Sequence, residues 1–176
     1  MIAIVLGGAE TVWEDFAALG MDGCVFAVNA AIPAHTGRIE HACTLHAENL
    51  GRWCRDRERA GRNMDFDRWT HKAKTGCGPV NVRSDWGGSS GLFAVKIARE
   101  LGFERIVLCG VPMDARLHFD RPGEWPDCHH YRRHWLRMKD EISPFVRSMS
   151  GWTRELLGSP DDAWLGRAVA DEVSDG

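Results

Sequence analysis

The segment from Gly87 to Asp114 constrains the fold more than any other part of the chain. It opens with the turn-forming stretch GGSSG, continues with an amphipathic run that predicts a helix, and closes with an apolar, strand-like run at residues 105–109. The backbone N–H groups at the start of such a helix, near Ser90 and Gly91, have no partner within the helix and coincide with the positive end of its dipole. The segment therefore predicts an α/β unit that binds an anion at the helix start.

Further apolar runs alternate with helical patterns in the same way. Strands are predicted at residues 2–6, 24–28, 41–45 and 79–83. Thr11 and Glu14 form a capping-box pattern, which predicts a helix from Thr11 to Gly20. The arginine-rich stretch 49–74 predicts a helix in its first half and a loop beyond it. Strands separated by helices favour a mostly parallel sheet with helices on both faces and ligands at the carboxyl ends of the strands.

The last third of the chain carries weaker patterns. A surface loop is predicted for residues 115–130 and a helix for residues 131–142. Beyond them, tryptophan and leucine residues predict short helices that pack on the body of the protein or on a second subunit. We therefore expect a single-domain, Rossmann-like α/β protein over residues 1–150. Residues 151–176 would form a helical tail that is not an independent domain and could support a homodimer.

Composition limits the classes of protein to consider. With 176 residues, of which 44% are hydrophobic and 27% charged, the chain can build one ordinary core but not two full-sized domains. A net charge of −3 argues against a protein whose main task is to neutralise a nucleic-acid backbone. The opening apolar run is too short to span a bilayer and lacks the basic residues of a signal peptide. We expect a cytoplasmic protein with no membrane anchor.

The six cysteines show no CxxC pair and no regular spacing. Cys24, Cys43 and Cys109 lie in apolar runs, where a thiol behaves as a small hydrophobic group. A metal could be assembled locally only from Cys128, His129, His130 and His134. Buried thiols are the favoured interpretation, and no metal site is predicted.

The predicted strand ends place small or polar residues where a ligand would lie. Gly8 follows the first strand and Asn29 ends the second, although Asn29 could equally satisfy the backbone of a turn. His46 follows the third strand, where a lone histidine is more often a structural hydrogen-bond partner. Asp114 could bind a metal ion or a ribose hydroxyl, or cap the turn that follows it.

Ser89 and Ser90 have two interpretations as well. Serine is favoured at a helix start for its own capping hydrogen bond, with no ligand present. The double glycine before the two serines favours a phosphate site. Two tryptophans, Trp86 and Trp125, flank the predicted site and could stack on a base or a sugar.

Three features of the sequence together resemble two related families. They are a first strand that ends in glycines, a second strand that ends in Asn29, and the block SSGLFAVKIARELGFERIVLCGVPMD. One family is the single-domain, Rossmann-like type of bacterial sialyltransferases. The other is the MptE-like group, whose best-known activity is 6-hydroxymethylpterin diphosphokinase. The resemblance spans residues 2–114. It implies that Ser89, Ser90 and Gly91 hold nucleotide phosphates, that Asn29 contacts the base or sugar and that Gly110 lies against the nucleoside, while Gly8 matches only a backbone role.

The chain departs from the sialyltransferase pattern after the last strand. Those enzymes carry an acid and a tyrosine-bearing lid there, whereas this sequence has Val-Pro-Met-Asp at residues 111–114 and a single tyrosine, Tyr131. The family's general base is a histidine in the segment after the lid, and His130 and His134 are the nearest equivalents. The chain also looks like small proteins encoded in bacteriophages and prophages, which assigns no chemistry.

These observations predict a small transferase that uses a nucleotide-activated donor, either a CMP-type nucleotide sugar or ATP. If the donor is ATP, Asp114 becomes a candidate magnesium ligand. An alternative of another class is a non-catalytic protein of phage type that binds a nucleotide for sensing or assembly, because the two lid tyrosines are missing. Either function would have a small-molecule nucleotide as its partner.

Overall fold

A seven-stranded parallel sheet forms the centre of the molecule within residues 1–73, 76 and 78–167, which are the residues described by this computed structural model. Its strand order is β5-β4-β3-β2-β1-β6-β9. The strands are β1 (Ile2–Leu6), β2 (Cys24–Val28), β3 (His41–Thr44), β4 (Asp67–Thr70), β5 (Asn81–Val82), β6 (Arg105–Cys109) and β9 (Val146–Ser148). The predicted Rossmann-like α/β class is confirmed.

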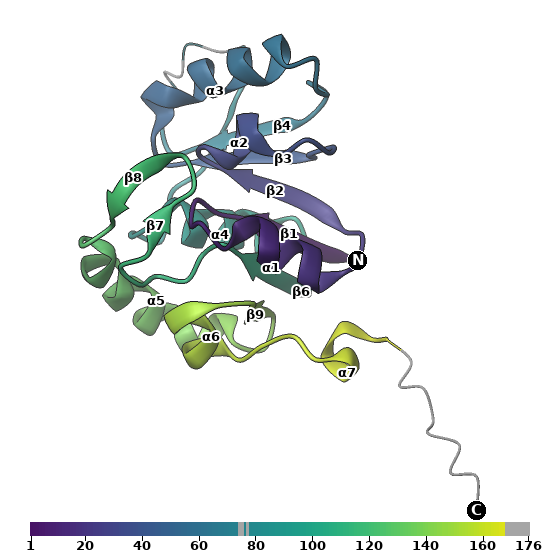
Figure 1. Cartoon of the computed structure of the whole chain (residues 1–176), viewed down its shortest axis with the longest axis vertical. Coiled ribbons are helices and arrows are strands. Elements are labelled where there is room, and N and C mark those ends of the chain that lie inside the picture. Colours follow the sequence, from purple (N-terminus) through teal and green to yellow (C-terminus); the bar gives the residue numbers. More distant parts are fainter. Residues whose placement is uncertain (74–75, 77, 168–176) are drawn as a thin grey trace, which may run out of the picture.

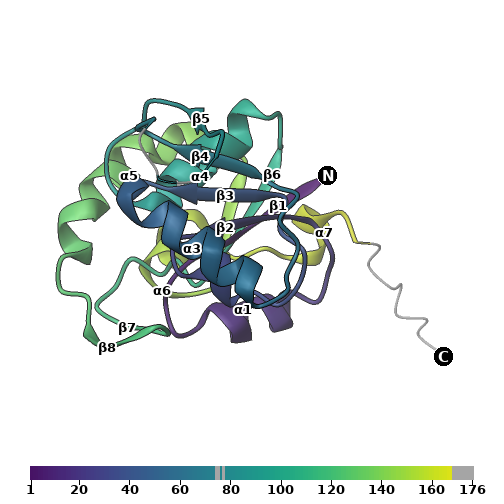
Figure 2. The same cartoon turned by 90° about the horizontal axis from the view of Figure 1, so that it is seen from above.

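Helices cover both faces of the sheet (Figures 1 and 2). One face packs against α1 (Val12–Leu19), α2 (Ala31–Ala34) and α3 (Ala47–Arg59). The other face packs against α4 (Ser90–Glu100) and α5 (Cys128–Ile142). In the described part of the C-terminal tail, α6 (Gly151–Leu157) lies beside β9, and α7 (Asp162–Leu165) adds Leu165 to the core on the α1 side.

The central strands are apolar on both sides, and this explains their continuous hydrophobic runs. In β1, Ala3 and Val5 join the core beneath α4, while Ile4 and Leu6 join the core beneath α1. All four side chains are fully buried. β1 pairs in parallel with β2 on one side and with β6 on the other, so Ile4 lies opposite Val25 and Val107. This double pairing fixes where β1 and β6 end relative to one another.

The chain changes direction between β1 and β6. From β1 it builds outward through β2, β3, β4 and β5, and α4 then returns it to the far side of β1, where β6 begins. The chain therefore continues from β1 and from β6 to helices on opposite faces of the sheet, α1 and α5. In open parallel sheets such a switch point creates a crevice beyond the carboxyl ends of the strands, where ligands bind.

Several predicted elements differ from the observed ones. The third strand ends at Thr44, one residue earlier than predicted, and the strand predicted at residues 79–83 is limited to β5. The predicted loop beyond α3 contains β4. Its pairing with β3 on one side and β5 on the other makes it a strand, although the adjacent charged residues Asp67 and Arg68 hide any apolar alternation.

The region after β6 is more ordered than predicted. Residues 115–130 were expected to form a surface loop, but they contain a two-stranded antiparallel hairpin, β7 (Leu117–His118) and β8 (Arg121–Glu124). The predicted helix at residues 131–142 begins earlier, at Cys128. Strand β9 was not predicted, because Val-Arg-Ser is too short to show any period.

Three smaller observations complete the fold. The capping box predicted from Thr11 and Glu14 does not form, because the Thr11 hydroxyl donates a hydrogen bond to Asp15 Oδ2 instead. Cys43 and Cys109 are buried, while Cys24 is half-buried and its burial raises the pKa of the thiol to about 11. Cys77 lies outside the described residues. Within the described ranges, no helix has the length and apolar character that a membrane span requires.

Candidate functional site

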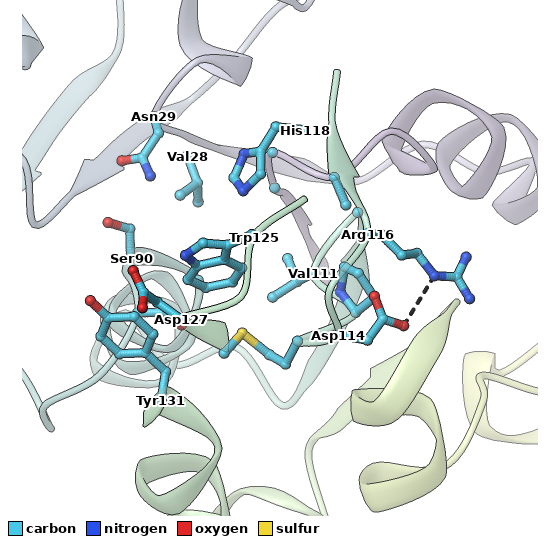
Figure 3. A pocket seen from close by; sticks show the side chains of 18 of the residues that line it. Val28, Asn29, Ser90, Val111, Asp114, Arg116, His118, Trp125, Asp127 and Tyr131 are labelled. Carbon is cyan, nitrogen blue, oxygen red and sulfur yellow. Dashed lines mark hydrogen bonds and ion pairs between the residues drawn. The ribbon is translucent and has the colours of Figure 1, made fainter. Parts of the chain in front are cut away.

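A cavity of about 420 Å³ opens at the carboxyl ends of β1, β2, β3 and β6 (Figure 3). This volume is within the range typical of small-molecule sites. The cavity has two kinds of wall. One wall, the strand-end wall, consists of Gly7, Gly8, Ala9, Val28, Asn29, Leu45, His46, Gly88, Ser89, Ser90, Gly91 and Gly110. The other, the hairpin wall, consists of Asp114, Arg116, His118, Arg121, Trp125, Asp127 and Tyr131, all from one continuous segment.

Glycines bring the loops after β1 and β6 into direct backbone contact. A Cβ atom on Gly7 would lie 2.2 Å from the Gly110 carbonyl oxygen, and one on Gly110 would lie 2.4 Å from Val12 Cβ. Gly110 also has a φ of +66°, in the left-handed region. Its carbonyl accepts a hydrogen bond of 3.1 Å from Ala9 N. A side chain on Gly7 or Gly110 would not fit at this junction, so these two residues line the cavity with main chain alone.

The start of α4 lines the cavity with Ser90 and Gly91, whose amides have no acceptor among the described residues. Ser89 is the N-cap, and its hydroxyl accepts hydrogen bonds from Leu92 N at 3.4 Å and from Trp135 Nε1 at 3.3 Å. The Ser90 hydroxyl accepts one of 3.0 Å from Leu45 N at the end of β3. Both hydroxyls therefore hold the helix start in place. The N–H groups of Ser90 and Gly91 occupy the first two helical positions, which have no acceptor within the helix.

Asn29 is held by its neighbour on β3. Its φ of +53° is left-handed, a conformation that asparagine tolerates better than most residues. The Thr44 hydroxyl accepts a hydrogen bond of 2.8 Å from His46 N and donates one of 2.7 Å to Asn29 Oδ1. This assignment leaves Asn29 Nδ2 as a donor for which the described residues supply no partner. Figure 3 shows the side chain at the rim of the cavity.

The residues predicted to bind a ligand lie together in the structure. The structure brings the eight residues Gly8, Asn29, His46, Ser89, Ser90, Gly91, Gly110 and Asp114 to the lining of this cavity. His46 is the N-cap residue of α3, and its Nδ1 lies 3.5 Å from Glu48 Oε1. Asp114 Oδ2 pairs with Arg116 Nε at 3.0 Å, while Asp114 Oδ1 is buried without a partner among the described residues.

Side chains from α5 and α6 hold the loop that carries Asp114 in place. Thr153 of α6 donates its hydroxyl to the Val111 carbonyl at 2.6 Å, and Arg132 Nε of α5 donates to the Met113 carbonyl at 2.8 Å. Met113 has a φ of +51°, an uncommon conformation for a residue with a side chain. These contacts hold the loop at the edge of the cavity.

The hairpin closes the cavity because it is joined to the loop after β1. Phe119 N donates to the Gly8 carbonyl at 3.1 Å, and Glu10 N donates to the Leu117 carbonyl at 2.9 Å. An antiparallel bridge also joins Ala9 to His118. Figure 1 places β7 and β8 beside the end of the sheet that is opposite the N-terminus. The hairpin thus extends over the glycines of the strand-end wall.

His118 is the cavity histidine that sequence patterns did not single out. Burial lowers the pKa of its imidazole, and the positive charge of Arg121 lowers it further, while Asp120 acts in the opposite direction. Its Nδ1 lies 3.9 Å from Asp120 Oδ1, and its Nε2 lies 3.5 Å from Arg121 Nη2. The lowered pKa favours the neutral form of the imidazole at pH 7. Only the position of the hairpin identifies it, and no motif in the sequence marks the hairpin.

The two histidines predicted as bases lie elsewhere. His130 is exposed on α5, and neither it nor His134 lines the cavity. His134 packs against the backbone of Gly87 and Gly88, because a Cβ atom on Gly87 would lie 2.6 Å from His134 Nδ1. Burial lowers the pKa of His134, and Arg133 and Arg137 lower it further. The structure therefore associates His134 with the turn before α4.

Comparison with known proteins adds no further assignment. No protein-family model, no curated protein and no solved structure matches this chain significantly. The chemistry of the cavity must therefore be argued from its own residues.

Proposed function

We propose that this protein binds a nucleotide in the cavity and acts as a small transferase that uses a nucleotide-activated donor. The observation that carries the proposal is the meeting of the free Ser90 and Gly91 amides with Asn29 and Gly110 in one cavity at the switch point of a parallel sheet. The resemblance of residues 2–114 to the sialyltransferase and MptE-like families supports the same function.

The phosphate groups would bind at the start of α4. The Ser90 and Gly91 amides offer two donors, and the helix dipole adds roughly half a positive charge at this end. The serine hydroxyls only accept hydrogen bonds within the protein, so their hydrogens would remain available to a phosphate in addition to the two amides. A main-chain cradle of this kind can also stabilise charge that develops on a leaving phosphate.

The nucleoside would lie across the ends of β2 and β6. Asn29 Nδ2 is available to an acceptor on the sugar or base, because Thr44 occupies the Asn29 oxygen. Gly110 lines the cavity at the end of β6, where the family resemblance places it against the nucleoside. Positioning of the donor by such contacts is itself a large part of catalysis by transferases.

Proton transfer would fall to His118 rather than to His130 or His134. His118 is the only one of the three that lines the cavity, and its lowered pKa keeps it neutral and able to accept the proton of an acceptor hydroxyl. The donors present do not fit a dedicated magnesium site. Asp114 Oδ2 is paired with Arg116, and across the described ranges no three histidine, cysteine or acidic side chains come together.

A second candidate function is nucleotide binding without catalysis. It is favoured by the presence of only one tyrosine in the chain, where the sialyltransferase pattern needs a lid that carries more. Such a sensing or assembly protein would use the same strand-end wall and would not need His118.

A binding screen followed by a turnover assay tests the proposal. Thermal unfolding would be followed with CMP, CDP, UDP, GDP, AMP, ATP and CMP-sialic acid, with and without magnesium, since a ligand of the native state raises Tm by mass action. We expect at least one nucleotide to raise Tm at millimolar concentration, and absence of any shift would overturn the proposal. With the donor known, His118→Gln should abolish transfer but keep binding, while His130→Gln and His134→Gln should keep both. Binding with no transfer to any acceptor would favour the second candidate.

A further inference from the structure

The hairpin wall contains a cluster of three aromatic rings, those of His118, Trp125 and Tyr131. The Trp125 and Tyr131 rings are 5.5 Å apart with an interplanar angle of 28°, and the His118 ring lies 5.6 Å from Trp125 at 83°. All three residues line the cavity. They follow β6 in the chain, beyond the block that carries the predicted phosphate site.

Trp125 differs from the other tryptophans near the site. The indole N–H of Trp135 donates to Ser89, and Trp86 does not line the cavity. For Trp125 Nε1 and for the Tyr131 hydroxyl, the described part of the chain supplies no hydrogen-bond partner. Trp125 is only half-buried, although its ring packs against the apolar core. An indole with a free N–H at a cavity wall is a surface suited to a flat, polar-edged ring.

The opposite side of the cavity completes such a subsite. Val28 and Leu45, at the ends of β2 and β3, are the larger apolar side chains of the strand-end wall. In the view of Figure 3, the Trp125 indole lies between Val28 and Tyr131. Aromatic and aliphatic side chains on the two walls would enclose a flat ring, while Tyr131 and Asp127 would face its hydrogen-bonding edge.

We infer that Trp125 and Tyr131 form the subsite for the nucleobase of the bound nucleotide, with the base stacked on Trp125. This inference rests on the proposed function and deepens it. It assigns recognition of the base to the hairpin wall and recognition of the phosphates to the strand-end wall. Stacking on an aromatic side chain tolerates any base, because each base has a π-face, so discrimination would come from the hydrogen-bonding groups around it.

The first test compares each of CMP, UMP, AMP and GMP with ribose 5-phosphate, which is the same molecule without the base. Isothermal titration of the wild-type protein should give a Kd at least tenfold lower for one of the nucleotides than for ribose 5-phosphate. Equal Kd values for ribose 5-phosphate and all four nucleotides would overturn the inference but leave the phosphate site intact. Failure of every probe to bind would overturn both proposals.

A second test locates the base. The Trp125→Leu variant should lose about tenfold or more in affinity for the preferred nucleotide and less than twofold for ribose 5-phosphate. Trp164→Leu is the matched control, because Trp164 is a half-buried tryptophan of α7 that packs on Arg147, 5.1 Å away, and does not line the cavity. An equal loss for both ligands, or no loss for either, would contradict stacking on Trp125.

An NMR measurement keeps the inference testable if Trp125→Leu does not fold. The eight indole N–H signals of a ¹⁵N spectrum can be resolved, and the conservative Trp125→Phe variant identifies the Trp125 signal by its loss. In wild-type protein, this signal should move with the nucleotide and move much less with ribose 5-phosphate. The Trp53 and Trp164 signals report regions away from the cavity and should stay in place. Equal movement of the Trp125 signal with both ligands would overturn the inference.

Discussion

Asp15 Oδ2 accepts a hydrogen bond of 2.8 Å from Gly110 N, although the two residues are 95 positions apart in the chain. The same oxygen accepts from the hydroxyls of Ser150 at 2.7 Å and Thr11 at 3.2 Å. Asp15 is buried on α1, so its carboxylate ties the end of β6 to α1 and to the turn before α6. One acceptor atom thus determines where the main chain of Gly110 meets the cavity.

Removal of this acceptor should destabilise the protein strongly. Asp15→Ala leaves the buried Gly110 N–H without a partner, and we expect the free energy of unfolding in urea to fall by about 2–4 kcal/mol. Asp15→Asn keeps an oxygen in the same place and should lose about half as much, because its bonds no longer involve a charged acceptor. Equal losses for the two variants would show that the acceptor atom does not hold the loop.

A negative charge at Ser89 should repel the proposed phosphate without harming the helix. Aspartate and asparagine are both good N-caps, and each can accept the hydrogen bonds that Ser89 receives from Leu92 and Trp135. Only aspartate adds a charge beside the Ser90 and Gly91 amides. We expect Ser89→Asp to weaken nucleotide binding about tenfold or more, and Ser89→Asn to weaken it less than threefold, as measured by calorimetry. Equal affinity of the two variants would exclude a phosphate at this position.

Alanine substitutions at two glycines allow two contributions to stability to be measured separately, namely steric crowding and backbone conformation. Gly110 and Gly61 both have positive φ values, +66° and +68°. A Cβ atom on Gly110 would collide with Val12, whereas one on Gly61 has nothing within 4 Å. Gly61→Ala should therefore reduce the free energy of unfolding by about 1 kcal/mol, from conformation alone. Gly110→Ala should reduce it by about 3 kcal/mol or more, because the chain must also shift. Similar values for the two would mean that the β1–β6 junction can relax.

His118 should make stability depend on pH. Burial lowers the pKa of His118 in the folded protein below its value near 6.5 in the unfolded chain. Below that pH the unfolded chain binds the additional proton, so stability is lost as the pH falls through 6.5 towards the folded-state pKa. His35 and His41 also have pKa values lowered by burial and act in the same direction. Urea unfolding at pH 7.5 and pH 5 should show a smaller loss for His118→Gln than for wild type. An unchanged loss would mean that His118 does not titrate in this window.

The sequence predicts the strand-end wall well, for a physical reason. Buried parallel strands require continuous apolar runs, and the residues that follow them must lie together at one edge of the sheet. This is why Gly8, Asn29, His46 and Ser90 could all be assigned to one site before their positions were known. The serine hydroxyls show the limit of such a prediction, since a pattern does not reveal which donor each oxygen already accepts.

The hairpin wall could not be predicted in this way. Leu117 and His118 form a strand because they pair with β8 and because the loop after β1 holds the hairpin by main-chain hydrogen bonds. Those bonds depend on backbone geometry and not on residue type, so they leave no trace in the sequence. The choice of His130 and His134 as bases followed from chain order, whereas His118 reaches the cavity through tertiary contact.

The division of the cavity into two walls also bears on how new binding properties could arise in this protein. The side chains of the hairpin wall come from one uninterrupted stretch, residues 114–131, which contributes no strand to the central sheet. A single exchange of that stretch, by recombination or by design, could replace all of the hairpin wall's contacts with a ligand at once. The sheet, its buried core and the main-chain cradle at α4 would remain as an unchanged platform for the new specificity.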